Sequence, residues 1–209
     1  MMSRSLGDIT FNGMAALFKL RDTLIPRDKV MSEVGIEQGF AVLDYGCGPG
    51  GYVLPTMDLV GPSGKYYALD RNPLAIRKVE RLAASKGLAN VETIQSDCAT
   101  GLPDASVDIV LLYDIFHMLE DADGVLRELW RVLKPDGTLS VSDHHLKEDA
   151  IVSGMTSGGL FRMTSKGKKT CSFAKTHGGT STEPLIEGYS GHAATDGNRE
   201  EEGGALSGD

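Results

Sequence analysis

Glycine residues and a carboxylate gather where an apolar run of the sequence ends. Residues 42–52 read Val-Leu-Asp-Tyr-Gly-Cys-Gly-Pro-Gly-Gly-Tyr. Such a run predicts a buried parallel strand that ends in a glycine turn, where main chain without side chains can lie close to a bound ligand. Asp44 stands two residues before the first glycine and adds one fixed negative charge. The stretch therefore predicts a cofactor loop.

The spacing of the glycines leaves two cofactors open. Gly46, Gly48 and Gly51 satisfy G-x-G-x-x-G, and Asp70 follows about 20 residues further on, as the dinucleotide fingerprint requires. Asp44 argues against that interpretation, because a carboxylate at this position would repel a pyrophosphate. It would suit an ammonium group, which a methionine-bearing nucleoside carries. A nicotinamide-dependent oxidoreductase remains the alternative enzyme.

Residues 42–52 resemble the first motif of class I S-adenosylmethionine-dependent methyltransferases, and the resemblance extends over roughly residues 34–175. Residues 102–108 and 133–139 are similar to the branch that contains quinone-biosynthesis C-methyltransferases. The resemblance implies S-adenosyl-L-methionine as the cofactor and in-line methyl transfer to a small-molecule acceptor. It does not name the acceptor. A non-catalytic module that binds the cofactor, as a regulator or partner subunit, stays open because no catalytic base is unmistakable.

The resemblance also assigns cofactor contacts. The glycine loop would wrap the methionine portion, Asp70 would accept hydrogen bonds from the ribose hydroxyls, and Asp97 would accept one from the adenine amino group. An alternative role for Asp70 is to cap the helix that begins at Pro73. The complete predicted set is Asp44, Gly46, Cys47, Gly48, Gly50, Asp70, Arg71, Asp97, Cys98 and Tyr113.

Further polar residues follow the fourth and fifth predicted strands. Asp114 and His117 come after the fourth strand, and residues 143–145, Asp-His-His, come after the fifth. The ordinary pKa of histidine, about 6.5, suits a base at neutral pH. His117, Asp114 and His144 are therefore the catalytic candidates. Adjacent histidines on an extended segment point in opposite directions, so no metal site is expected.

Strands and helices alternate along the middle of the chain. Strands are predicted from residue 42 and over 65–69, 91–95, 107–113 and 138–142, and helices over 51–60, 73–86 and 121–133. A helix over 149–157 and a hairpin of strands 160–164 and 170–174, turning at 165–168, complete the pattern. The predicted fold class is α/β: a Rossmann-like, seven-stranded, mostly parallel sheet with a terminal antiparallel hairpin and helices on both faces.

Composition divides the chain into three parts. Residues 1–40 are predicted to hold two helices, over 9–24 and from Pro26 to Gly35. Two roles stay open: both helices cover one edge of the sheet, or the first folds over the cofactor as a lid. Residues 41–176 form the methyltransferase domain, and the acidic residues 177–209 are predicted to be disordered because they have little apolar surface to bury.

Charge and cysteine usage bear on partners and compartment. The net charge of -8 and the pI of about 5.1 argue against a nucleic-acid partner. No apolar run is long enough for a membrane span or a signal peptide, and three widely spaced cysteines suit free thiols in a reducing compartment, so a cytoplasmic protein is expected. A homodimer is compatible with the sequence.

Overall fold

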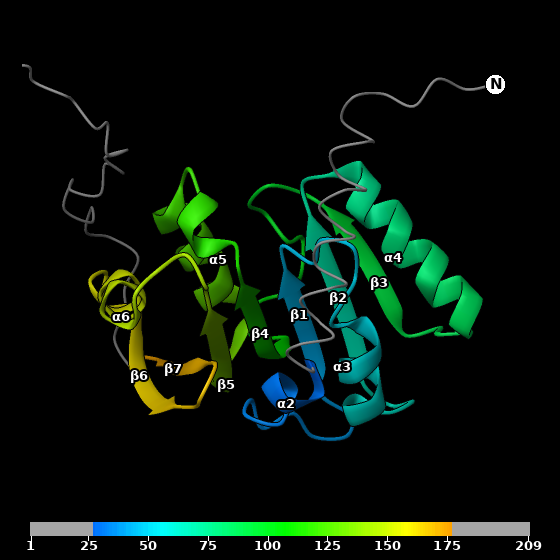
Figure 1. Cartoon of the computed structure of the whole chain (residues 1–209), viewed down its shortest axis with the longest axis horizontal. Helices are drawn as coiled ribbons and strands as arrows, with labels where there is room; N and C mark the ends of the chain where they lie inside the picture. Colours follow the sequence, from blue (N-terminus) through cyan, green and yellow to red (C-terminus); the bar gives the residue numbers. More distant parts are fainter. Residues whose placement is uncertain (1–26, 177–209) are drawn as a thin grey trace, which may run out of the picture.

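A computed structural model describes residues 27–176, which form one seven-stranded sheet (Figure 1). The strand order is β3-β2-β1-β4-β5-β7-β6, and β7 is the strand that runs antiparallel to the other six. The strands are β1 (Ala41–Tyr45), β2 (Lys65–Asp70), β3 (Val91–Gln95), β4 (Val107–Tyr113), β5 (Leu133–Ser142), β6 (Phe161–Lys166) and β7 (Cys171–Lys175). The predicted α/β fold class is confirmed.

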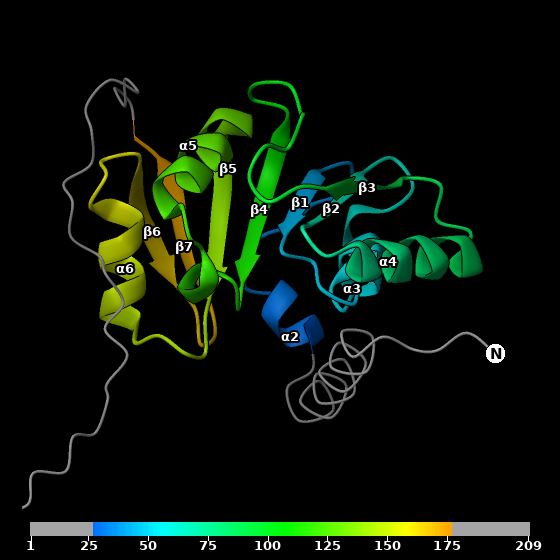
Figure 2. The same cartoon turned by 90° about the horizontal axis from the view of Figure 1, so that it is seen from above.

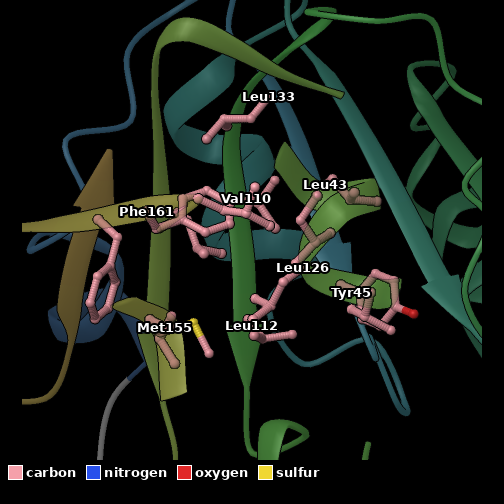
Figure 3. Close-up of a cluster of buried hydrophobic side chains, with 14 of the residues drawn as sticks. Leu43, Tyr45, Val110, Leu112, Leu126, Leu133, Met155 and Phe161 are labelled. Carbon is pink, nitrogen blue, oxygen red and sulfur yellow. The ribbon is translucent and has the colours of Figure 1, made fainter. Parts of the chain in front are cut away.

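Helices cover both faces of the sheet. They are α2 (Arg27–Met31), α3 (Val53–Val60), α4 (Pro73–Lys86), α5 (Ala122–Val132) and α6 (Glu148–Thr156), with a short 3-10 turn, η1 (Phe116–Met118), after β4. Figure 2 shows α2, α3 and α4 together on one side of the sheet. The side chains of one cluster on the other face come from the strands and from α5 and α6 (Figure 3).

The two cores follow from the alternation of side chains along the central strands. Val42 and Leu111 belong to the cluster that contains α2 and α3, whereas Leu43 and Val110 belong to the cluster that contains α5 and α6. All four side chains are fully buried. A strand that buries both faces reads as a continuous apolar run, which is why β1 and β4 were recognisable in the sequence.

The order of the strands fixes where the loops meet. The chain reverses its direction of travel across the sheet between β1 and β4, which are neighbours although β2 and β3 lie between them in sequence. In open α/β sheets, ligands bind beside the carboxyl ends of the strands at such a switch point. The loops after β1, β2, β4 and β5 are therefore brought to one edge of the sheet.

Three predicted boundaries were wrong. Helix α2 ends at Met31 and not at Gly35, because residues 32–35 form a turn. The sequence 135–137, Pro-Asp-Gly, was expected to separate helix from strand, but β5 already begins at Leu133, and these residues form a bulge where the register with β4 shifts. The hairpin turn lies at residues 167–170, not 165–168, because Ser165 and Lys166 still pair with β7. The carboxylate of Glu33 holds this turn by accepting hydrogen bonds from the main-chain amides of Lys169 (3.0 Å) and Thr170 (3.2 Å).

The predicted helix over 9–24 and the predicted disordered tail over 177–209 lie outside the described residues. Among the helices of residues 27–176, none has the length and hydropathy that a membrane span requires.

Candidate active site

The loop after β1 is held against the carboxyl end of β2. Its glycines at positions 46, 48 and 50 have φ angles of +82°, +51° and +82°, in the left-handed region that glycine adopts without penalty. The main-chain amide of Gly46 donates to the carbonyl of Leu69 at 2.8 Å. The amide of Gly48 donates to Oδ2 of Asp70 at 2.9 Å. These hydrogen bonds hold the loop against the carboxyl end of β2.

The space around these glycines fits a cofactor cradle. A Cβ atom placed on Gly48 would meet no atom within 4 Å, so the chain is open there. A Cβ on Gly46 would lie 2.9 Å from Cγ1 of Ile115, so the loop packs closely on the segment after β4. A Cβ on Gly51 would overlap the guanidinium of Arg27. Gly51, the third glycine of the G-x-G-x-x-G spacing, therefore leaves room for the side chain of Arg27.

Asp70 ends β2 and binds two main-chain amides at once. Besides Gly48, its carboxylate accepts a hydrogen bond from the amide of Asn72 at 2.8 Å. The side chain that caps α4 is that of Asn72, which accepts from the amide of Leu74 at 2.9 Å. The alternative role of Asp70 as the helix cap is therefore wrong. Its carboxylate is oriented beside the glycine loop, where a ribose could approach it.

Asp44 lies near the end of β1 and is almost completely buried, with 2% of its surface exposed. The hydroxyl of Tyr66 donates a hydrogen bond to Oδ2 of Asp44. Burial raises the pKa of Asp44 to about 6, and the hydrogen bond from Tyr66 and the charge of Arg27 oppose this rise. A buried carboxylate with so few compensating contacts favours the approach of a cation such as an ammonium group.

A cavity of about 300 Å³ opens beside this loop, at the carboxyl ends of β4 and β5. The α2 and α3 side contributes Arg27, Val30 and Tyr52, and the opposite wall is the hairpin turn, residues 166–171. Asp114, Asp143 and His144 also line it. The cavity is thus lined by elements from three distant parts of the sequence.

Two carboxylate–imidazole pairs cross this edge of the sheet. Oδ2 of Asp143 lies 2.7 Å from Nδ1 of His117, and Oδ1 of Asp114 lies 2.6 Å from Nδ1 of His144. The ring of His145 lies between the other two imidazoles, with centroid distances of 4.2 Å to His117 and 3.9 Å to His144. The expectation that His144 and His145 point in opposite directions was wrong, because residues 144–146 form a turn and not an extended strand.

A family model described as a methyltransferase domain matches residues 36–190. The chain belongs to this methyltransferase family. The predicted class and its cofactor, S-adenosylmethionine, are thereby confirmed, and the family assignment goes against a nicotinamide-dependent oxidoreductase.

Solved and curated relatives agree with this assignment. An S-adenosylmethionine-dependent methyltransferase from Aquifex aeolicus has 28% sequence identity and a TM-score of 0.67, covering 77% of this chain and 96% of that chain. Demethylmenaquinone methyltransferase of Geobacillus kaustophilus is 30% identical over 61% of this chain and 55% of its own length. A ubiquinone/menaquinone biosynthesis C-methyltransferase of Hahella chejuensis is 30% identical over 68% of this chain and 61% of its own length. The chain spans about half the length of the first of these curated relatives.

Within the methyltransferase domain, two of the predicted cofactor residues have buried side chains, so only their main-chain atoms can contact a bound cofactor. The side chain of Cys47 is buried in the α2–α3 core. The hydroxyl of Tyr113 lies 2.7 Å from Oγ of Ser140 in the interior. Asp97 and Cys98 follow β3. The main-chain carbonyl of Asp97 accepts a hydrogen bond from the hydroxyl of Tyr45. The side chain of Asp97 is exposed and can therefore contact a cofactor. Arg71 is exposed and pairs with Glu120 at 3.3 Å.

Some residues of the methyltransferase site were not assigned a role from the sequence. Asp143 was noted only as part of the Asp-His-His segment, although its fully buried side chain holds His117. Arg27 and the hairpin turn gave no recognisable motif, and they reach the cavity only through the tertiary fold. Tyr66 is a buried residue of the apolar strand β2, and nothing in the sequence pairs it with Asp44. The signal for Asp143 was its place directly after a strand.

Proposed function

We propose that this chain transfers a methyl group from S-adenosyl-L-methionine to a small-molecule acceptor in the cavity beside the glycine loop. The observation that carries the proposal is the contact between loop and cavity: Ile115 packs on Gly46, and the preceding residue, Asp114, lines the cavity. The bound cofactor supplies an electrophilic methyl group. The residues of the chain have to bind the acceptor, align it and exclude water.

The acceptor class follows from the cavity and from the relatives. A volume of about 300 Å³ is at the small end of ligand pockets and suits a compact ring system. The curated relatives are named for demethylmenaquinone and ubiquinone, which contain quinone rings. A quinol-type ring with oxygen substituents is therefore the first acceptor class to test.

The polar groups divide into two roles within this proposal. Asp114 and His144 line the cavity and would contact the acceptor. His117 does not line the cavity; its ring binds Asp143, so we assign it the role of positioning that carboxylate. The sequence had offered both His117 and His144 as residues that face the acceptor. In this proposal only His144 has that role.

Methyl transfer can be tested directly with S-adenosylmethionine that carries a labelled methyl group. Wild-type protein is incubated with a demethylated quinol analogue and, separately, with a metabolite extract. We expect label in a small molecule, and at least about 10-fold less label when Asp70→Ala protein replaces the wild type at limiting cofactor. Cofactor binding without transfer to any acceptor would support the alternative of a non-catalytic binding module. Nicotinamide cofactors that bind as tightly as S-adenosylmethionine would contradict the proposed function itself.

The remaining predictions on partners are part of the proposal. A small-molecule acceptor and a net charge of -8 favour a cytoplasmic enzyme that works without nucleic acid. The homodimer stays a prediction, which light scattering of the purified chain would test.

A further inference from the structure

Three side chains at the carboxyl ends of β4 and β5 converge on one point. Asp114, Asp143 and His144 each offer one ligand atom, and these three atoms lie within 4.8 Å of one another. All three residues line the cavity to which the proposed function assigns the acceptor. They come from two neighbouring strands, since Asp114 follows β4 and the other two follow β5.

The burial of the three groups differs in a way that suits a site with one open side. The side chain of Asp143 is fully buried, that of Asp114 is 21% exposed and that of His144 is 54% exposed. Two carboxylates that share a partly desolvated site repel each other, and a divalent cation would offset this repulsion. The protein closes one side of the cluster, and the cavity leaves the other side accessible.

The surroundings orient these groups as outer contacts orient metal ligands. Oδ1 of Asp143 accepts from the main-chain amide of His145 at 3.0 Å, and Oδ2 accepts from the amide of His117 at 3.2 Å. Nδ1 of His144 lies 2.6 Å from Oδ1 of Asp114. Two ligand atoms that bind one cation at about 2.1 Å and at a right angle to each other are about 3 Å apart. A small movement that separates Nδ1 of His144 from Oδ1 of Asp114 would therefore make room for an ion.

The donor atoms indicate which class of cation would bind. Two carboxylate oxygens and one imidazole nitrogen suit first-row divalent ions such as Mn²⁺ and Zn²⁺ better than Mg²⁺ or Ca²⁺, which prefer oxygen ligands throughout. Three protein ligands leave coordination positions open, as in catalytic metal sites.

We infer that Asp114, Asp143 and His144 form a binding site for a first-row divalent cation whose open positions face the acceptor cavity. The role of this site rests on the proposed function: the cation would bind an oxygen substituent of the acceptor ring and hold the ring beside the cofactor. Binding of the cation itself does not depend on that function.

The experiment titrates chelator-treated, full-length protein with Mn²⁺ and follows the loss of the free-ion signal by electron paramagnetic resonance. We expect one saturable site per chain, competed by Zn²⁺, with affinity reduced at least 10-fold in Asp114→Asn and in His144→Ala. Asp143→Asn should behave alike, but this side chain is buried and the variant has to be shown folded by circular dichroism. His144→Ala changes a half-exposed side chain and keeps the test valid if Asp143→Asn fails to fold.

Two controls separate this site from other carboxylates. Glu148→Gln changes an acid that lines the same cavity, pairs with Lys166 and stands outside the cluster, so it should bind Mn²⁺ like the wild type. Replacing Glu200, Glu201 and Glu202 by glutamine tests whether the acidic terminal segment binds Mn²⁺, and this variant should also bind Mn²⁺ like the wild type. Absence of a site tighter than about 1 mM, or binding that persists in the Asp114 and His144 variants, would overturn the inference. Calorimetry with S-adenosylmethionine on the metal-free protein tests the proposed function separately.

Discussion

Tyr66 donates a hydrogen bond from its hydroxyl to the carboxylate of Asp44 inside the core. The two residues lie on neighbouring parallel strands, with Tyr66 paired to Val42 and Asp44 paired to Ala68. The side chain of Tyr66 thus crosses to the residue at which β1 leads into the glycine loop. A carboxylate held in this way keeps its position before the cofactor arrives.

The first prediction concerns the cost of burying Asp44. Because burial raises the pKa of Asp44 from 3.8 to about 6, the folded protein binds this proton more tightly than the unfolded chain. Stability therefore falls as the pH rises from about 4 to about 6. Asp44→Asn should abolish this loss and be more stable than the wild type by about 3 kcal/mol at pH 7.5, but not at pH 4. Urea unfolding at both pH values measures the difference.

The same variant should bind S-adenosylmethionine at least 10-fold more weakly, because a neutral amide does not attract an ammonium group as a carboxylate does. Gains in stability and losses in affinity would then come from one side chain. A stability difference that is the same at both pH values would contradict the argument.

A second prediction compares two glycines with similar backbone conformations. Gly48 and Gly87 have φ angles of +51° and +66°, and a Cβ on either would meet no atom within 4 Å. Gly48→Ala and Gly87→Ala should therefore each cost about 1 kcal/mol of stability for the left-handed backbone. Gly87 ends α4, whereas Gly48 stands in the loop, so only Gly48→Ala should also weaken cofactor binding, by about 10-fold or more. Equal affinities in calorimetry would remove Gly48 from the cradle.

Asp70 provides the third prediction. Asp70→Ala should weaken S-adenosylmethionine binding by about 1.5–3 kcal/mol, because charge-assisted hydrogen bonds to the ribose would be lost together with the bond that orders Gly48. The matched control is Asp58→Ala, which removes an exposed acid from α3 and should leave the affinity unchanged. Calorimetry on both folded variants gives the comparison, and an unchanged affinity of Asp70→Ala would remove Asp70 from the cofactor site.

The strands and helices were largely predictable because each element depends on short-range patterns. The apolar runs of β1 and β4, the helix start at Pro73 and the stop at Gly87 can each be read within a few residues. The bulge at Pro135 escaped prediction because proline and glycine usually end elements, and only pairing with Val107 and Ile109 keeps this segment in the sheet. Local sequence does not contain that pairing.

The candidate site was predictable only as a set of residues at strand ends. Their neighbours in space depend on strand register and turn geometry. Asp143, after β5, contacts His117, after the neighbouring strand β4. The rings of His144 and His145 lie together because the chain turns there. Alternation along an extended strand would have separated these rings, and it was the wrong assumption. The cavity wall formed by Arg27 and the hairpin turn depends on contacts more than 100 residues apart, such as those between Glu33 and Thr170.

The fourth prediction tests a structural carboxylate away from the site. Glu128 accepts hydrogen bonds from Arg131 and from the amide and hydroxyl of Thr100, at 2.6–2.8 Å. The hydrogen bonds from Arg131 are the largest cause of the lowered pKa of Glu128, about 2 compared with the usual 4.5. Its contribution to stability is therefore present above pH 4.5 and is lost as the pH falls towards 2.

Glu128→Gln should accordingly lower the free energy of unfolding by about 2 kcal/mol at pH 7 and by much less near pH 2.5. Glu92→Gln removes a half-exposed partner of Lys65 and should cost less than about 1 kcal/mol at pH 7. Denaturant titrations of the three proteins across this pH range give the comparison, and a pH-independent effect of Glu128→Gln would refute it.

The last prediction separates the two imidazoles of the proposed acceptor site. His144 lines the cavity, so His144→Ala should lower turnover by about 100-fold while the affinity for S-adenosylmethionine stays near that of the wild type. His117 acts through Asp143, so His117→Ala should lower turnover by only about 10-fold and raise KM for the acceptor. His117→Asn keeps a side-chain donor for Asp143 and should restore most of the activity. If His117→Asn were as impaired as His117→Ala and both lost as much turnover as His144→Ala, His117 would itself contact the acceptor, and the division of roles between the two histidines would have to be reversed.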